Sequence, residues 1–154
     1  MSTLSLMPAL ALAVSLAGTV VLGLVRKRPA ARDGVAIVTA ALQLLCVALL
    51  LPAVLGGATI ELTLLAWSPA VAIALRVDAL GLLFALTASG LWLLSAVYAV
   101  GYLRALRSPA QTRFHACFAL TMTATLGVAF AANLVTMFLF YELMTLATYY
   151  LVVH

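Results

Sequence analysis

Long apolar runs alternate with short polar connections along most of this 154-residue chain. Five such runs follow one another, at residues 4–25, 34–55, 78–103, 114–132 and 133–154. A helix needs about 20 mostly apolar residues to cross a hydrocarbon core of about 30 Å, and each run is close to that length. The third run is the longest, so its helix should tilt or protrude. The pattern predicts an all-α integral membrane protein with about five transmembrane helices.

The segment between Gly56 and Val77 breaks this pattern. Around Thr59–Trp67 polar and apolar residues partly alternate, as in an extended chain. We expect an external loop there, with a β-hairpin as the alternative and Arg76 and Asp78 at a solvated loop end. The chain then divides into residues 1–77, with two transmembrane helices and this loop, and residues 78–154, with helices three to five.

The basic residues predict an orientation in the membrane. Cytoplasmic connections are enriched in Lys and Arg. Seven of the eight basic residues lie in a short loop at 26–33 or in the connection at 104–113, namely Arg26, Lys27, Arg28, Arg32, Arg104, Arg107 and Arg113. We therefore expect the N-terminus and the loop near Trp67 outside, and His154 at a cytoplasmic C-terminus. Because the basic cluster follows the first run, that run should stay attached and not be cleaved as a signal peptide.

Composition supports the membrane class and excludes several functions. Hydrophobic residues make up 67% of the chain and charged residues only 8%, against about a quarter charged in soluble domains. In such a chain the net charge of +4 mostly reports where the loops lie, so nucleic-acid binding is not indicated. Cys46 and Cys117 form no CxxC pair and are expected as small buried residues. No metal ligands, cofactor site, catalytic residues or active site of its own are predicted.

Glu142 is the strongest candidate for a functional residue. It lies nine positions after Asn133, which as helix is about 13 to 14 Å, near the bilayer midplane. A charged residue there costs about 2.5 to 3.5 kcal/mol on insertion scales, so it is rarely without a purpose. Thr145 and Tyr149 share its face at helical spacing. A proton or ion pathway is one interpretation, and a structural hydrogen bond between helices is the other.

Four further polar residues in the apolar runs are candidates. Thr121 and Thr125 are spaced to extend the polar path, although threonines in helices often bond back to their own carbonyls. His115, near the expected cytoplasmic surface, is a site for proton uptake or an interfacial amphipathic side chain. Gln43 should find a partner on a facing helix or touch a polar pathway. Two small-residue faces are expected to pack closely, Ala9-Ala13-Ala17 and Gly81-Ala85-Ser89. For the first of them, chance spacing in an alanine-rich chain is the alternative.

Several segments resemble a known family. Arg113–Leu120, Leu126–Asn133 and Phe138–Tyr149 resemble the antiporter-like proton-channel subunits of respiratory complex I, membrane-bound hydrogenases and Mrp-type Na+/H+ antiporters. Val77–Leu86 and Tyr98–Tyr102 also look like the third-helix region of that family, so the resemblance covers about residues 70 to 154. Residues 140–149 together with His154 look most like the Mrp D-type subunit. Residues 1–69 are similar only in hydropathy.

The resemblance implies a role for Glu142. In the family, the acid at this position pairs with a lysine two helices further on and sets protonation along a central polar axis. That lysine is not in this chain, which is expected to be a fragment, a split gene product or a degenerate relative. The expected partners are other membrane subunits, the lipid bilayer, and protons or Na+, in a bacterial-type inner membrane. A redox-driven proton translocase of the NADH:quinone oxidoreductase type is one context, with no redox cofactor in this chain.

Two functions therefore remain open from the sequence. The chain supplies the glutamate half of a proton or monovalent-cation pathway to a larger assembly, or it is a non-conducting structural or assembly subunit. A free-standing transporter is disfavoured, since transporters usually place a midplane site between two repeats that five helices do not provide.

Overall fold

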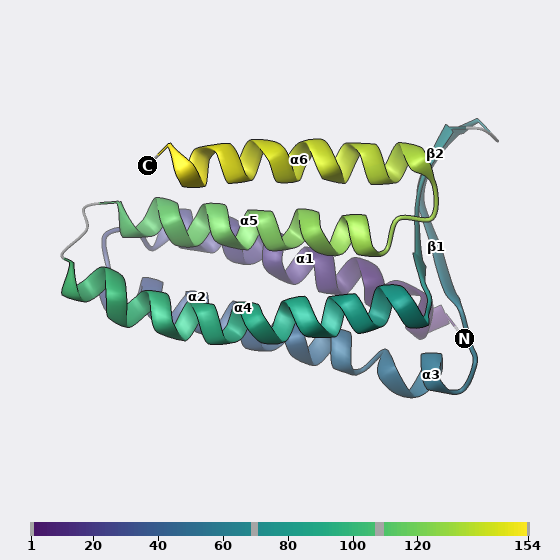
Figure 1. Cartoon of the computed structure of the whole chain (residues 1–154), viewed down its shortest axis with the longest axis horizontal. Helices are drawn as coiled ribbons and strands as arrows, with labels where there is room; N and C mark the ends of the chain where they lie inside the picture. The colour runs from purple at the N-terminus through teal and green to yellow at the C-terminus, as the bar shows by residue number, and fades with distance from the viewer. Residues whose placement is uncertain (1, 69–70, 107–109, 154) are drawn as a thin grey trace.

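This computed structural model describes residues 2–68, 71–106 and 110–153. The expectations for Arg107 and His154 lie outside the described residues. Each predicted apolar run forms a helix, and Figure 1 shows the long helices lying side by side. They are α1 (Ser2–Leu24), α2 (Pro29–Ala48) continued by the short α3 (Leu51–Leu55), α4 (Ala79–Ala105), α5 (Gln111–Ala129) and α6 (Leu134–Val152).

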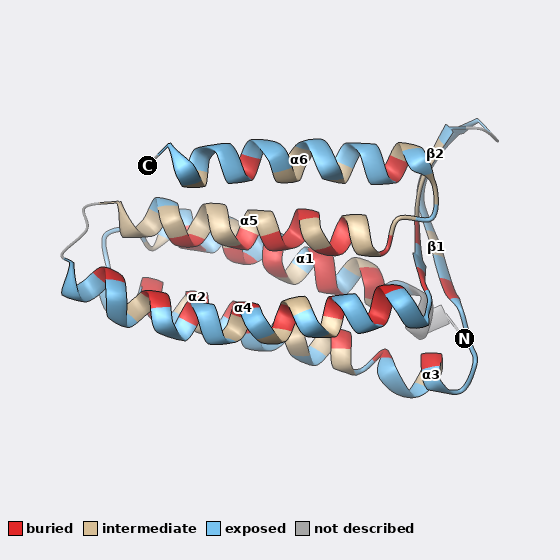
Figure 2. Ribbon diagram, in the orientation of Figure 1, coloured by how far each residue is buried: buried red, intermediate tan, exposed pale blue. Residues whose placement is uncertain are grey.

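The helices pack in a definite order. Helix α1 packs against α2 and α5, α2 packs against α4, and α6 packs on α5 at the edge of the bundle. The N-terminal and C-terminal halves of the chain thus share one bundle, and the division at residue 77 stays a prediction. Figure 2 shows buried residues on the facing sides of the helices and exposed residues along much of α6.

Residues 60–77 form a β-hairpin across one end of the bundle. Strands β1 (Ile60–Ser68) and β2 (Val71–Val77) are antiparallel, with Ile60 opposite Val77. The turn between α5 and α6 joins the hairpin, since Arg76 N donates to Phe130 O at 2.6 Å and Ala132 N donates to Ala74 O at 2.9 Å. The protein is therefore mostly helical and not all-α, and the hairpin alternative is confirmed.

The two charged residues at the end of the hairpin have different roles. Arg76 is exposed and lies 3.7 Å from Glu61 on the facing strand, as expected of a solvated loop end. Asp78 instead caps α4, because its Oδ1 accepts from Gly81 N at 2.7 Å. An aspartate at this position stabilises the first turn of a helix.

Four helical stretches are long and apolar enough to cross a membrane. Among the described residues these are Leu6–Leu24, Pro29–Leu55, Ala79–Ala105 and Leu134–Val152. Helix α5 has 19 residues but is more polar, since it carries Arg113, His115 and several threonines. The count of about five spans therefore stays a prediction. Figure 1 places the connection after α1, the C-terminal end of α4 and the N-terminal end of α5 at the end opposite the hairpin, an arrangement compatible with the predicted orientation.

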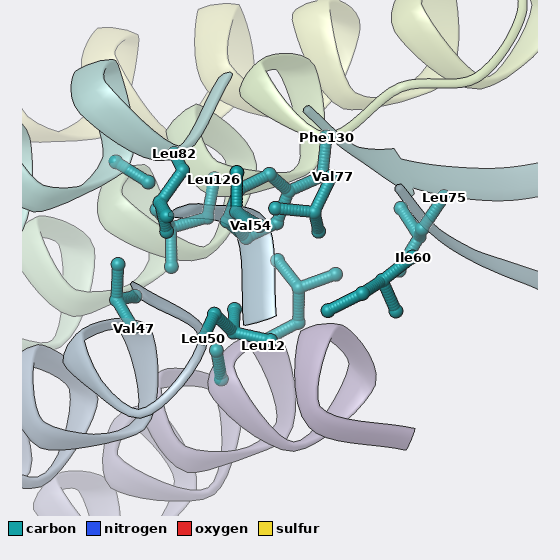
Figure 3. Close-up of a cluster of buried hydrophobic side chains, with 12 residues drawn as sticks. Leu12, Val47, Leu50, Val54, Ile60, Leu75, Val77, Leu82, Leu126 and Phe130 are labelled. Atoms are coloured by element: carbon teal, nitrogen blue, oxygen red, sulfur yellow. The ribbon is translucent and has the colours of Figure 1, made fainter. Parts of the chain in front are cut away.

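Two apolar clusters hold the bundle together. The hairpin-end core, shown in Figure 3, gathers side chains from helices and both strands: Ala11, Leu12, Val47, Leu50, Val54, Ile60, Leu75, Val77, Leu82, Ala85, Leu126 and Phe130. The basic-end core consists of Leu22, Ala36, Ala40, Trp92, Ala96, Ala119 and Met122. Burial of such side chains contributes about 25 cal/mol per Å² of apolar surface where it is removed from water.

Only one of the two predicted small-residue faces is a packing face. Gly81-Ala85-Ser89 is buried, and a Cβ on Gly81 would lie 2.7 Å from Ala129 O. The prediction for Ala9-Ala13-Ala17 is wrong, because Ala13 and Ala17 are exposed. The neighbours of α1 lie instead on the side of Gly18, where a Cβ would meet the Thr39 methyl group at 2.3 Å.

Candidate functional site

Glu142 lies in the middle of α6, on the face turned away from the bundle. The helix starts after Asn133, whose side-chain oxygen accepts from Thr136 N at 2.8 Å. The buried residues of α6 are Thr136 and Ala147, whereas Glu142 is exposed. Because α6 is an edge helix, nothing in the described part of the chain covers its outer face.

Thr145 and Tyr149 share this outer face, as the helical spacing predicts. Both side chains are exposed. Thr145 Oγ1 donates to Tyr141 O at 3.1 Å, so its hydroxyl hydrogen is used within α6 while its oxygen can still accept. A shallow groove follows the face toward the C-terminus and is lined by Met144, Thr145, Thr148, Tyr149 and Val152. We call Glu142, Thr145 and Tyr149 the outer polar face.

Thr121 and Thr125 are half-buried on α5 and bond to their own helix. Thr121 Oγ1 donates to Cys117 O at 2.9 Å, and Thr125 Oγ1 donates to Thr121 O at 2.8 Å. The back-bonding alternative is therefore confirmed. Thr125 faces α6, since its Oγ1 lies 3.8 Å from Met144 Sδ. Within the described residues no hydrogen bond connects either threonine to Glu142.

His115 is buried inside the bundle. Its side chain is 3% exposed, and its Nε2 has no hydrogen-bond partner among the residues that the structure describes. The ring meets Phe114 edge-on at 5.6 Å, and the charges of Asp33 and Arg32 act on it. The alternative of an interfacial amphipathic side chain predicts an exposed ring, whereas this ring is buried within the bundle.

A charge cluster centred on the buried Asp33 lies beside His115 and was not predicted from the sequence. Asp33 Oδ1 accepts from Arg32 Nε at 2.8 Å and Oδ2 accepts from Arg104 Nε at 2.5 Å. Arg32 Nη2 also donates to Gln111 Oε1, and Gln111 Nε2 donates to Leu103 O at 2.9 Å. The cluster joins α2, α4 and α5 at the basic end.

The loop predicted at residues 26–33 is too long. Helix α2 starts at Pro29, so Arg32 and Asp33 lie in its first turns and face the bundle. Proline is favoured at the first position of a helix. Pro29 was therefore the signal that could have placed these residues on a helix and not in a loop.

The described residues contain no group of three or more His, Cys, Asp and Glu side chains that could hold a metal ion. They also contain no Lys, Arg or His in an ion pair with Glu142. The outer polar face thus offers one carboxyl group, one hydroxyl and one phenol. These groups can accept, donate and relay hydrogen bonds, and the carboxyl can hold or release a proton.

Comparisons with known proteins give likenesses in sequence and in fold. No family model matches this sequence. Over 78 residues, 51% of this chain, it is 37% identical to Na+/H+ antiporter subunit A1 of Staphylococcus aureus strains RF122 and JH9. The chain spans 10% of the length of these curated relatives. It also matches a chain in the structure of the membrane-bound sulfane sulfur reductase, an archaeal respiratory membrane complex, with a TM-score of 0.76.

The chain shares its fold with part of that protein. The match covers 90% of this chain and 21% of the other, at 23% sequence identity. Together with the apolar helices, the two likenesses agree on a multi-pass membrane protein.

Proposed function

We propose that the chain is a membrane subunit, or the N-terminal part of one, that contributes to proton or monovalent-cation translocation in an Mrp antiporter or complex I-like assembly. Its relative in sequence is a subunit of a Na+/H+ antiporter, and its relative in fold belongs to a respiratory membrane complex. The observation that carries the proposal is the outer polar face, with Glu142 midway along α6 and open to a neighbour. The assembly lies in a bacterial-type inner membrane and moves protons or Na+.

The chemistry of the face explains why a neighbour is needed. A carboxyl group facing hydrocarbon at the centre of a helix costs about 2.5 to 3.5 kcal/mol on insertion scales. Glu142 has no ion-pair partner in the described part of the chain. A basic side chain from another segment or subunit, such as the lysine that the family resemblance implies, offsets that cost.

The other proposed pathway residues supply hydrogen-bonding groups on α5 and α6. Thr145 and Tyr149 continue the face along α6, and their oxygens can hold water against the helix. Thr121 and Thr125 keep free lone pairs although their hydrogens bond back, so they can accept hydrogen bonds. In this proposal His115, beside the charged cluster at the basic end, takes up protons. A D-type identity of the subunit is part of the same proposal.

A second candidate function is that of a non-conducting structural or assembly subunit. The observation that favours it is the same edge position of α6, because an open apolar helix face binds a partner helix whether or not ions pass. Glu142 would then form a structural hydrogen bond across the interface. Loss of the carboxyl group would stop ion transport under the first function and weaken assembly under the second.

The test compares Glu142→Ala with a matched variant of the other glutamate, Glu61→Ala, which removes an exposed acid from the hairpin. Each is introduced into the assembly in its own membrane. Ion-coupled proton movement in everted vesicles and co-purification of the partner subunits are measured together. The proposal predicts that Glu142→Ala loses transport in an intact assembly, while Glu61→Ala retains both. Loss of assembly would favour the structural function, and full transport by Glu142→Ala would refute the pathway.

A further inference from the structure

Two polar side chains in the centre of the bundle are buried without partners. Gln43 on α2 and Ser89 on α4 are both fully buried. Among the described residues, neither amide atom of Gln43 nor the hydroxyl of Ser89 has a hydrogen-bond partner. Buried polar groups in folded proteins are almost always hydrogen-bonded, to protein or to ordered water, so each orphaned atom needs an explanation.

These residues belong to a layer that crosses four helices. One buried polar residue lies between the two apolar cores on each helix: Ser15 of α1, Gln43 of α2, Ser89 of α4 and Thr123 of α5. Along each helix the polar residue stands between two core residues. In the order of the helices above, these pairs are Leu12 and Leu22, Ala40 and Val47, Ala85 and Trp92, and Met122 and Leu126. In each pair one residue belongs to the hairpin-end core and the other to the basic-end core. The polar residues therefore lie at one level of the bundle, with apolar packing on both sides.

One hydrogen bond already links two members of this central polar layer. Thr123 Oγ1 lies 2.8 Å from Ser15 Oγ and 3.1 Å from Ala119 O, and Ser15 Oγ donates to Leu12 O at 3.1 Å. The hydrogens of this pair are thus used, whereas oxygen lone pairs remain for further donors. Ser15 and Thr123 can accept hydrogen bonds but have little left to donate.

We propose that the central polar layer is a buried water site, in which water molecules bind the amide group of Gln43 and the hydroxyl of Ser89. An amide carries two N–H donors and a carbonyl with two lone pairs. A direct bond between Gln43 and Ser89 would satisfy one side of the amide and leave the other without a partner. Water, with two to four hydrogen bonds, can satisfy both sides and reach the free lone pairs of the Ser15–Thr123 pair.

Small side chains make up most of the layer. Serine and threonine supply three of its four members, whereas Leu12, Leu126, Trp92 and Met122 fill the cores on either side. Water is also the ligand that fits the charge of the layer, since all four side chains are neutral. An internal ion would require a compensating charge, because an isolated charge in a low-dielectric interior is costly.

The water site is separate from the outer polar face. On α5, Thr123 bonds to Ser15 of α1, whereas Thr125 contacts Met144 of α6. Helix α5 therefore stands between the central polar layer and α6. This inference concerns the interior of the bundle and does not rest on the proposed role of Glu142.

Side-chain amide NMR tests the site directly, because Gln43 and Gln111 are the two glutamines of the chain. The protein is labelled with side-chain 15N-glutamine in lipid bilayers, and magnetisation transfer from water to each amide is recorded. Gln43→Met identifies the Gln43 signal by its loss, and Gln111→Met is the matched control that leaves it in place. We expect clear transfer from water to the Gln43 amide, with a build-up rate that Ser89→Ala lowers at least twofold.

Two results would overturn the site. A wild-type Gln43 amide that receives no magnetisation from water would mean that protein atoms alone surround it. An unchanged build-up rate in Ser89→Ala would show that Ser89 does not share the water.

Discussion

Replacement of Asp33 by Asn should destabilise the basic end of the bundle. The Asp33 side chain is 3% exposed and that of Arg32 is 9% exposed, so this ion pair is buried. Removing one partner of a buried ion pair leaves the other charge uncompensated and costs about 3 to 5 kcal/mol. Gln111 still accepts from Arg32 in the variant. We therefore expect a loss in the free energy of unfolding near the lower limit, about 3 kcal/mol.

Arg104→Gln is the matched variant for this prediction. Arg104 also bonds to Asp33, at 2.5 Å, but its side chain is 56% exposed. Solvent screens such a pair, so the expected loss is about 1 kcal/mol or less. Asp33→Asn takes the carboxylate away from both arginines, whereas Arg104→Gln leaves the buried pair of Arg32 and Asp33 in place.

Trp92 provides the assay. It is 4% exposed in the basic-end core, with its ring 6.3 Å from that of Phe118. In a Trp67→Phe background its fluorescence reports unfolding of this end in detergent as denaturant is added. The reasoning is refuted if Asp33→Asn and Arg104→Gln cost the same, or if Asp33→Asn unfolds like the wild type.

Two further predictions concern packing and orientation. A Cβ at Gly127 would lie 2.1 Å from the Phe140 ring, so Gly127→Ala should lower the free energy of unfolding by about 1 to 3 kcal/mol. Gly90→Ala is the control and should not lower it, because no atom lies within 4 Å of a Cβ there. Thermal unfolding compares the two variants. Single cysteines at the exposed Arg28 and Thr63 should react with impermeant reagents from the cytoplasmic and the outer side, respectively, and reversed labelling would contradict the predicted topology.

The helices were predictable because their signal is local. Each apolar run is long enough to span a bilayer, and a run of that kind has few alternatives to a helix. The hairpin was predictable only as an alternative, since it depends on hydrogen bonds to residues 130–132, far away in the sequence. The position of Glu142 along its helix followed from counting residues.

The direction in which side chains point was much less predictable. Ala13 and Gly81 each belong to a stripe of small residues, yet only Gly81 packs, because the neighbours of α1 lie on its other side. Asp33 looked like a loop residue because the basic residues around it suggested solvent. Inside the bundle it bonds to Arg104, 71 residues later in the chain. The open outer face of Glu142 likewise follows from the edge position of α6, which hydropathy does not indicate.

The most direct test of the proposed function asks whether transport needs a titratable carboxyl group at position 142. Glu142→Gln keeps the size of the side chain and removes its acid, whereas Glu142→Asp keeps the acid on a side chain shorter by one methylene. Transport is measured per assembled complex in proteoliposomes, with the quenching of a pH-sensitive dye as the readout. The proposal predicts partial activity for Glu142→Asp and background activity for Glu142→Gln. Equal activity of Glu142→Gln and the wild type would contradict it.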